Sequence, residues 1–288
     1  MPNTITLKRR IGSVKNTRQI TKAMELVAAS KMRRAQDYAK TGRYYREAAY
    51  SLLTRLSAIT EVSEHPLFVK REIKKRLYIV ISSNRGLAGA YNSNILRLLT
   101  ASVIEDDKAG ISVSVIAAGK QAANFARRLE SVELLAAYES FGDQPTANDV
   151  RPLLDTVSNM YENKEVDDVV LLYTDFKSNL VQIATKLPLL PARFETAENV
   201  ESLENVTFEP SIGQVLDGVT ERLLEVQLWQ AMLESIASEH SMRMMAMKSA
   251  TDNASDLIDD LTLAFNTARQ SAITQELAEI TGGAEAMK

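Results

Sequence analysis

One stretch near the C-terminus constrains the fold more than any other feature. Residues 219–281 run for 63 positions without a Gly or a Pro. Because both residue types interrupt helices, this composition favours one continuous α-helix, about 95 Å long at 1.5 Å per residue. Apolar or small side chains recur along it at steps of three or four, with His240 as the exception. A sustained spacing of this kind indicates the seam of a left-handed coiled coil.

A helix of that length needs a partner of comparable length. Residues 3–65 contain no Pro and only two Gly, and their apolar positions also recur at helical spacing, which predicts a helix over residues 5–59 that ends before Pro66. We therefore expect an antiparallel left-handed coiled coil of the N- and C-terminal helices. The seam residues expected on the C-terminal helix are Met244, Met247, Ala250, Ala254, Leu257 and Leu261.

The charge distribution supports this pairing but leaves a second possibility open. Residues 1–76 carry 18 Lys or Arg and 6 Asp or Glu, a net of +12, whereas residues 217–288 carry 5 and 12, a net of −7. The two helices would thus carry complementary charge. The basic segment 31–46 also interleaves Tyr38, Tyr44 and Tyr45 with its charges. That arrangement is equally compatible with a nucleic-acid-binding face.

The middle of the chain has a different pattern. Apolar, β-branched runs at residues 76–83, 111–118 and 166–174 predict buried strands, and 179–191 predicts a further one; helices are expected near 92–100, 120–129 and 147–162. This β-α-β rhythm predicts an inserted Rossmann-like α/β domain. The expected domains are 1–65, 75–210 and 211–288, with residues 192–210 as a linker or sheet edge.

The composition excludes several kinds of site. The chain has no Cys and only two His, His65 and His240, so a disulfide framework, a zinc-thiolate site and a cysteine nucleophile are absent. Two glycine turns, "SSNRGLAGAYNS" at 82–93 and "AAGKQAANF" at 117–125, follow predicted strands but lack the spacing of phosphate-binding loops. Adjacent acids such as Asp167 and Asp168 point to different faces and are expected to be solvated. We expect no catalytic residue, cofactor or metal.

Three motifs resemble the γ subunit of F-type ATP synthases. "RIGSVKNTRQITKAMELVAASKMRRAQ" at 10–36 is similar to that family's N-terminal helix, and "RMMAMKSATDNA" at 243–254 to its C-terminal helix. "ITQELAEITGGAEA" at 273–286 matches the family signature I-T-x-E-x-x-E-x-x-x-G-A-x-[AS]. The turn 84–92 and "FEP" at 208–210 also resemble family segments, although Asn84 stands where the family commonly has Asp. The resemblance covers the whole chain.

The resemblance implies a central-stalk rotor that is not itself catalytic. Its coiled coil would stand inside a ring of three α and three β subunits, and its α/β domain would meet the ε subunit and the c ring, so that proton-driven rotation is transmitted to the catalytic subunits. Met24, Arg243, Gln270, Thr274 and Glu276 match positions that meet the αβ catch and bore. Arg85, Phe208 and Glu209 match the foot at the c ring and ε. The expected location is the cytoplasmic face of a bacterial plasma membrane, peripherally bound.

Overall fold

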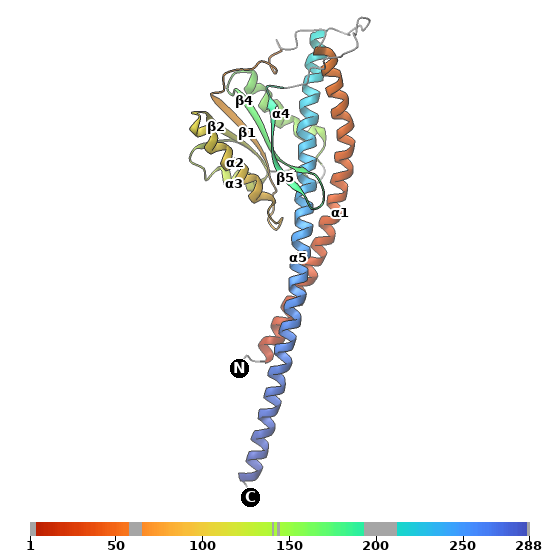
Figure 1. The fold of residues 1–288 in the computed structure, drawn as a ribbon, viewed down its shortest axis with the longest axis vertical. Coiled ribbons are helices and arrows are strands. Elements are labelled where there is room, and N and C mark those ends of the chain that lie inside the picture. The colour runs from red at the N-terminus through yellow and green to blue at the C-terminus, as the bar shows by residue number, and fades with distance from the viewer. Residues whose placement is uncertain (1–3, 58–64, 140, 143–144, 193–211, 287–288) are drawn as a thin grey trace. The chain divides into compact units, whose positions relative to one another are not determined.

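The computed structural model describes residues 4–57, 65–139, 141–142, 145–192 and 212–286 (Figure 1). Its elements, in chain order, are α1 (Thr4–Ser57), β1 (Lys75–Ile81), α2 (Tyr91–Lys108), β2 (Ser112–Ala118), α3 (Lys120–Ala126), β3 (Val132–Tyr138), α4 (Ala147–Glu162), β4 (Asp168–Phe176), β5 (Gln182–Leu190) and α5 (Ile212–Ala286). The chain forms two compact units, Met1–Ala28 with Arg243–Lys288, and Ala29–Met242.

The second unit contains one five-stranded sheet in the order β3-β2-β1-β4-β5. The first four strands are parallel, and β5 pairs with β4 in the antiparallel direction. Parallel neighbours need crossover connections, and α2, α3 and α4 supply them in turn. The strand order leaves β1 at the centre, which agrees with its side chains being buried from Leu77 to Ile81.

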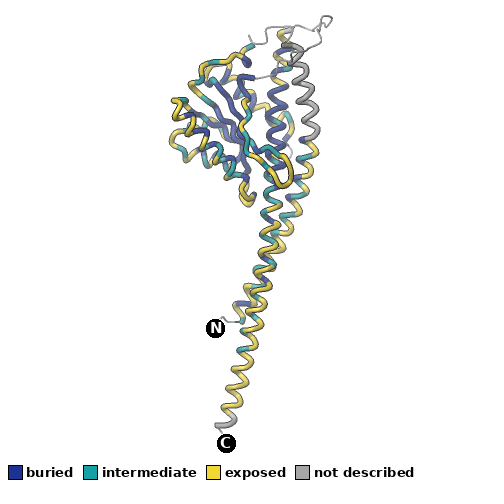
Figure 2. The backbone as a smooth tube through the Cα atoms, in the orientation of Figure 1, coloured by how far each residue is buried: buried dark blue, intermediate teal, exposed yellow. Residues whose placement is uncertain are grey.

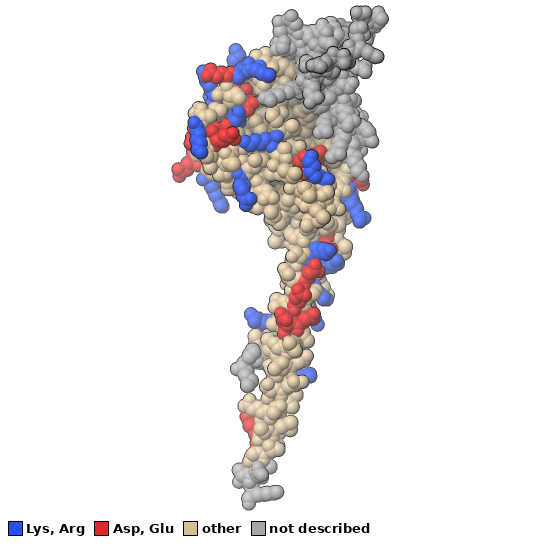
Figure 3. Space-filling view, in the orientation of Figure 1, with Lys and Arg blue, Asp and Glu red and all other residues tan. Residues whose placement is uncertain are grey.

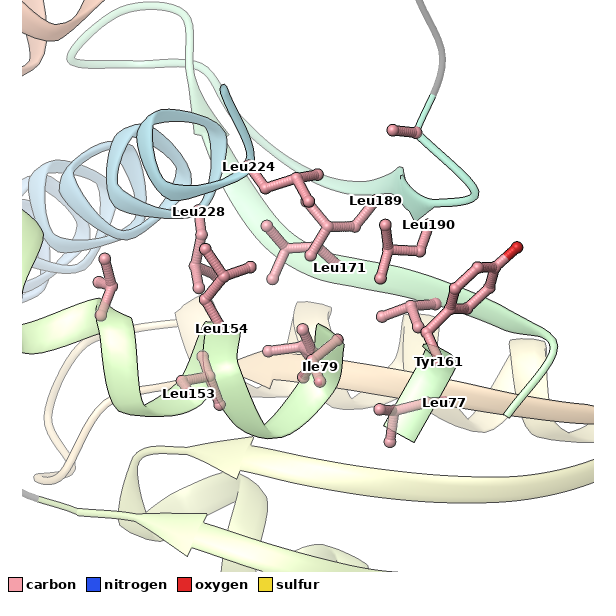
Figure 4. Close-up of a cluster of buried hydrophobic side chains, with 14 of the residues drawn as sticks. Leu77, Ile79, Leu153, Leu154, Tyr161, Leu171, Leu189, Leu190, Leu224 and Leu228 are labelled. Carbon is pink, nitrogen blue, oxygen red and sulfur yellow. The ribbon is translucent and has the colours of Figure 1, made fainter. Parts of the chain in front are cut away.

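Helices cover both faces of this sheet, so that two hydrophobic cores form. On one face, α2 and α3 pack through Ile95, Leu99 and Ala122 onto Val80 and Leu172. On the other face, α4 and the first turns of α5 pack onto Leu77, Ile79 and Leu171 (Figure 4). The α5 residues in this second core are Leu216, Leu223, Leu224, Leu228, Ala231 and Met232. The beginning of α5 therefore belongs to the globular core.

Helix α4 begins with a local hydrogen-bonded cap. The Asp149 carboxylate accepts hydrogen bonds from the Thr146 backbone N–H at 2.7 Å and from the Thr146 hydroxyl at 2.8 Å. These bonds lower the pKa of Asp149, because they stabilise its ionised form. A carboxylate in the first turn also interacts favourably with the positive end of the helix dipole.

The predicted elements agree with the observed ones except at one strand. A long helix was expected at each end of the chain, and α1 and α5 have 54 and 75 residues. Helix α5 begins before Gly213 and Gly218, so its start lies earlier than the Gly-free stretch. Strand β3, "VELLAAY", was not predicted, because Leu, Ala and Glu favour helices. In the structure its burial alternates, as in a half-exposed edge strand. The expected linker falls almost wholly outside the described residues.

Within the described residues, none of the helices combines the length and apolarity that a membrane span needs.

Candidate partner-binding surfaces

In the first unit, the beginning of α1 packs against α5 along a narrow line of buried side chains. Leu7 and Ala28 are buried on α1, and Met247, Ala254 and Ile258 are buried on α5. The Thr251 hydroxyl lies 2.8 Å from the Thr21 hydroxyl and donates a hydrogen bond to it. Figure 2 shows that most of the surrounding surface of these segments is exposed. The shared surface is therefore a thin seam of aliphatic, small and hydroxyl-bearing side chains.

The structure locates each residue expected in this seam. Met247 and Ala254 are buried, whereas Met244, Ala250 and Leu261 are partly buried. Leu257 is 45% exposed, and Ile258, 7% exposed, occupies the buried position instead. The step from Ala254 to Ile258 is four residues, which keeps the buried line on one side of a helix with 3.6 residues per turn. His240, in the second unit, is buried as an interior side chain.

The residues expected to meet the catalytic subunits lie on the first unit. Met24 and Arg243 are partly buried, and Gln270, Thr274 and Glu276 are exposed. The Thr274 hydroxyl donates to the Gln270 carbonyl of its own helix at 2.9 Å. The side chains of Gln270 and Glu276 therefore face solvent near the C-terminal end of α5.

This end of α5 exposes an apolar row. All residues from 272 to 283 are exposed. Ile273, Leu277 and Ile280 are 49%, 58% and 67% exposed, at spacings that place them on one side of the helix. A row of large aliphatic side chains on an otherwise unpacked helix is typical of a surface that another protein covers.

Charged side chains on the first unit point outward, away from the seam. The exposed cations of α1 are Lys8, Arg9, Arg10, Lys15 and Arg18, and the exposed acids of α5 are Asp252, Asp256, Asp259 and Asp260. None of these nine side chains forms an ion pair with any residue that the structure describes, and the ion pair seen on this part of α1 is Lys22–Glu25. These nine complementary charges of the first unit therefore do not pair across the seam. Figure 3 shows acidic side chains gathered along α5.

In the second unit, the two glycine turns close on each other instead of forming an anion site. The backbone N–H groups of Lys120 and Ala122, at the start of α3, donate to Asn84 Oδ1 at 3.0 Å and to Ser82 Oγ at 2.9 Å. The N–H of Gln121 donates to the Ser83 carbonyl at 3.1 Å. A Cβ on Gly119 would lie 2.2 Å from the Ser82 carbonyl oxygen, so the turns are in direct contact. The backbone N–H groups of Lys120, Gln121 and Ala122 are therefore already bonded and are not free to bind a phosphate.

Asn84 joins three segments at this edge of the sheet. Its side-chain oxygen accepts from Lys120, and its Nδ2 donates to the Glu139 carbonyl at 2.8 Å. An Asp at this position could accept the first bond but, when ionised, could not donate the second. Arg85 follows Asn84 and is exposed, while its carbonyl accepts a hydrogen bond from Ser83 Oγ at 2.6 Å. Phe208 and Glu209 lie outside the described residues.

At the opposite end of the sheet, where the parallel strands β1 and β4 begin, buried charged side chains form a hydrogen-bonded network. Arg76 Nε donates to Asp168 at 2.6 Å, and Arg76 Nη1 donates to Asp106. The Tyr78 hydroxyl donates to Asp106 at 2.6 Å, and burial together with this bond raises the pKa of Tyr78. The pKa of Arg76 is also raised: its burial acts in the opposite direction, but its interactions with Asp168 and Tyr78 together outweigh it. The expectation of a solvated Asp168 was wrong, because Asp168 is 4% exposed and pairs with Arg76.

This network ties β1, β4 and α2 together. Ligands of open α/β sheets bind at the carboxyl ends of the strands, whereas these groups lie at the amino ends. Asp167 is likewise occupied, because its carboxylate accepts the backbone N–H groups of Lys74 and Lys75 at 2.9 and 3.0 Å. Asp167 and Asp168 therefore stabilise the fold, and their geometry is not that of an acid–base pair.

Comparison with known proteins gives the same family along the whole chain. The model of the ATP synthase family matches residues 3–287. The ATP synthase gamma chain of Heliobacterium modesticaldum is 40% identical over 294 residues, covering 100% of each chain. That of Acidithiobacillus ferrooxidans is also 40% identical, with 100% of each chain covered.

Solved structures share the fold. A chain of the Euglena gracilis mitochondrial ATP synthase OSCP/F1/c-ring structure has a TM-score of 0.69 at 17% identity, covering 99% of this chain and 94% of that one. A chain of the Tetrahymena thermophila mitochondrial ATP synthase central stalk and c ring has a TM-score of 0.64 at 23% identity, covering 80% of this chain and 99% of that one. With identity of about 40% along its full length to the curated relatives, the chain belongs to the ATP synthase gamma chain family.

Proposed function

We propose that this chain is the central-stalk rotor subunit of an F-type ATP synthase. In this role it transmits rotation of a membrane c ring to the catalytic α and β subunits during ATP synthesis coupled to proton transport. The observation that carries the proposal is the exposed row Ile273, Leu277 and Ile280 at the end of α5. Such a row is typical of a surface that a partner covers, and the surrounding α and β subunits would cover it.

The shaft itself would be an antiparallel left-handed coiled coil of the two terminal helices, joined to a Rossmann-like domain. Its thin seam of small, hydroxyl-bearing and methionine side chains supports this reading. Methionine is flexible and tolerates changing neighbours. A rotor that presents different sides of one shaft to each of three equivalent partners benefits from such adaptable packing more than from a single interlocking pattern.

Specific contacts follow from the family's pattern. We assign Met24, Arg243, Gln270, Thr274 and Glu276 to the surface that meets the αβ catch and bore. Exposed amide, hydroxyl and carboxylate groups there could form and break hydrogen bonds at each rotational step.

The foot would lie in the second unit. Arg85 would meet the c ring or the ε subunit, together with Phe208 and Glu209, and Arg85 is exposed on its turn as such a contact requires. The complex would sit peripherally at the cytoplasmic face of a bacterial membrane, attached through the c ring.

The chain would contribute no catalytic residue of its own. The occupied helix start at α3 supports this, because a nucleotide-dependent enzyme on this sheet would need free donors for phosphate. The alternative of a nucleic-acid-binding coiled coil gains no support from the relatives, which are named as ATP synthase gamma chains.

Co-expression with α and β subunits tests the proposal. We expect a complex with one copy of this chain per three αβ pairs, and no ATPase activity from the isolated chain. A chain that purifies alone under these conditions, or that hydrolyses ATP by itself, would show that the rotor assignment is wrong. Salt-sensitive binding to duplex DNA by the purified chain would instead favour the nucleic-acid alternative.

A further inference from the structure

The hairpin formed by β4 and β5 extends beyond the rest of the sheet. Pairing between β1 and β4 ends at Val80 and Leu172, whereas pairing between β4 and β5 continues to Phe176 and Gln182. The last residues of β4 therefore have β5 on one side and no strand on the other. An open strand edge leaves backbone N–H and C=O groups that need partners when they are buried.

Two serines of α5 supply those partners at Thr174. Ser235 Oγ accepts the Thr174 N–H at 3.0 Å, and Ser238 Oγ donates to the Thr174 carbonyl at 3.2 Å. All three residues are buried. The serines are three positions apart, so that neighbouring hydroxyls on one side of α5 take the place of a missing strand.

The loop at the end of the hairpin then contacts both long helices through one residue. Asn179 Oδ1 accepts from Gln36 Nε2 of α1 at 3.2 Å, and the Asn179 carbonyl accepts from Ser241 Oγ of α5 at 2.9 Å. Gln182 Nε2 strengthens the second contact, lying 2.8 Å from the Asn179 carbonyl and 3.2 Å from Ser241 Oγ. All of these residues belong to the second unit.

Hydrogen bonds, and not apolar burial, hold this loop. Leu180 is 76% exposed and Val181 is 48% exposed, so the apolar side chains of the tip do not pack on the helices. Ser241 lies one residue before the end of the second unit at Met242. The bonds of Asn179 and Gln182 to Ser241 thus tie the hairpin to α5 near the C-terminal boundary of the second unit. A shaft transmits torque without lag only if it cannot turn within its attachment, so a stiff attachment adds to the stiffness of the whole.

We propose that the β4–β5 hairpin is a torsional clamp at the root of the shaft, with Ser235, Ser238 and Ser241 as its positioning residues and Asn179 as the tie between α1 and α5. The proposal rests on the rotor function given above. The clamp resists twisting of α5 against the sheet, so that torque entering the α/β domain reaches the shaft without angular slack.

The test uses the full chain assembled with α and β subunits and compares the parent with the triple variant Ser235→Ala, Ser238→Ala and Ser241→Ala. Alanine fits the same space and favours the helix, so α5 is retained. Ser255→Ala is the matched control, because among the described residues its hydroxyl bonds to the Thr251 carbonyl of its own helix, at 3.1 Å, and to no other group. The readouts are amide hydrogen exchange and the angular fluctuation of a probe on the α/β domain in single complexes stalled without nucleotide turnover.

We expect protection of the Thr174 amide to fall about fivefold for the lost hydrogen bond, and angular fluctuations to widen, with unloaded ATPase activity unchanged. The control should match the parent in both. Unchanged fluctuations in the triple variant would overturn the clamp while leaving the rotor function intact. Failure of the parent chain to assemble or rotate would instead overturn the rotor function.

If the triple variant does not assemble, Ser241→Ala and Gln36→Ala test the same clamp singly. Gln36 and Asn179 meet at the surface, so we expect Gln36→Ala to fold as the parent does. Each single variant should still widen the fluctuations relative to Ser255→Ala, and fluctuations equal to those of the parent in both would reject the clamp.

Discussion

The Thr251 hydroxyl donates a hydrogen bond to the Thr21 hydroxyl at 2.8 Å, joining α5 to α1 in the first unit. Each hydroxyl also lies within hydrogen-bonding reach of a carbonyl of its own helix, that of Met247 at 2.8 Å and that of Arg18 at 3.0 Å. The Thr251 hydroxyl thus donates its hydrogen bond across to α1, while the Thr21 hydroxyl donates its own to the Arg18 carbonyl of the same helix. This pair is a polar contact within a seam formed largely by aliphatic and small residues.

Replacing one threonine of this pair should cost more than replacing both. Thr251→Val keeps the shape but leaves Thr21 without its partner, so we expect the free energy of unfolding to fall by about 0.5–1.5 kcal/mol. The double variant with Thr21→Val should recover part of that loss. Urea denaturation of the four proteins of the cycle measures the coupling; additive losses would mean that the hydroxyls do not interact.

The methionines of α5 should differ in how much they contribute to stability, according to how far each is buried. Met247 is buried and Met245 is 40% exposed. We expect Met247→Ala to lower the free energy of unfolding by about 2–5 kcal/mol, as for other buried large-to-small changes, and Met245→Ala to change it by about 0.5 kcal/mol or less. Thermal denaturation followed by circular dichroism compares them, and equal losses would contradict the seam as described.

The exposed row on α5 should matter for assembly and not for folding. Leu277→Ser alters a side chain that is 58% exposed, so the stability of the isolated chain should change by about 0.5 kcal/mol or less. Yield of the complex with α and β subunits should fall clearly. Ala278→Ser, next to it but outside the row, is the control. An undiminished yield for Leu277→Ser would show that the exposed row does not bind the α and β subunits, and the rotor proposal would lose its main support.

Asn84 should be more important to the sheet edge than an exposed turn residue. Asn84→Ala removes both its bonds and should lower the free energy of unfolding by about 1–3 kcal/mol, whereas Asn84→Asp keeps the acceptor for Lys120 and should lose less. Asn124→Ala, which removes an exposed bond to Arg127, is the control. Equal stability of all three variants in urea would show that the turn does not depend on this amide.

Stability should fall at high pH because of buried tyrosines. Burial raises the pKa values of Tyr78 and Tyr161 above the ordinary value of 10.0. Above pH 10 the unfolded chain loses these protons before the folded chain does, so the folded state binds more protons and stability decreases as pH rises. Urea midpoints measured between about pH 8 and pH 11 should decline for the parent.

Tyr78→Phe separates this effect from general alkaline unfolding. The variant should be less stable than the parent near neutral pH, because Asp106 loses the 2.6 Å bond from the tyrosine hydroxyl. It should also lose less stability above pH 10, since one of the two groups no longer titrates. Parallel curves for the two proteins would contradict a raised pKa at Tyr78.

The sequence by itself determined the long helices, the alternation of strands and helices between them, and the family. The absence of Gly and Pro over residues 219–281 leaves a helix few alternatives, and the apolar runs of β1, β2 and β4 are long enough to require burial on both faces. These features are local, so one stretch of sequence contains all the information they need.

Only the tertiary structure decided which side chains meet. It placed Ile258 and not Leu257 in the seam, because the phase of a 75-residue helix depends on its partner as well as on its own residues. It buried Asp168 against Arg76 and joined Thr174 to Ser235 across 61 positions. It also revealed β3, whose helix-favouring residues form a strand because β2 offers it an open edge. Contacts between distant segments decide such features, and no local pattern records them.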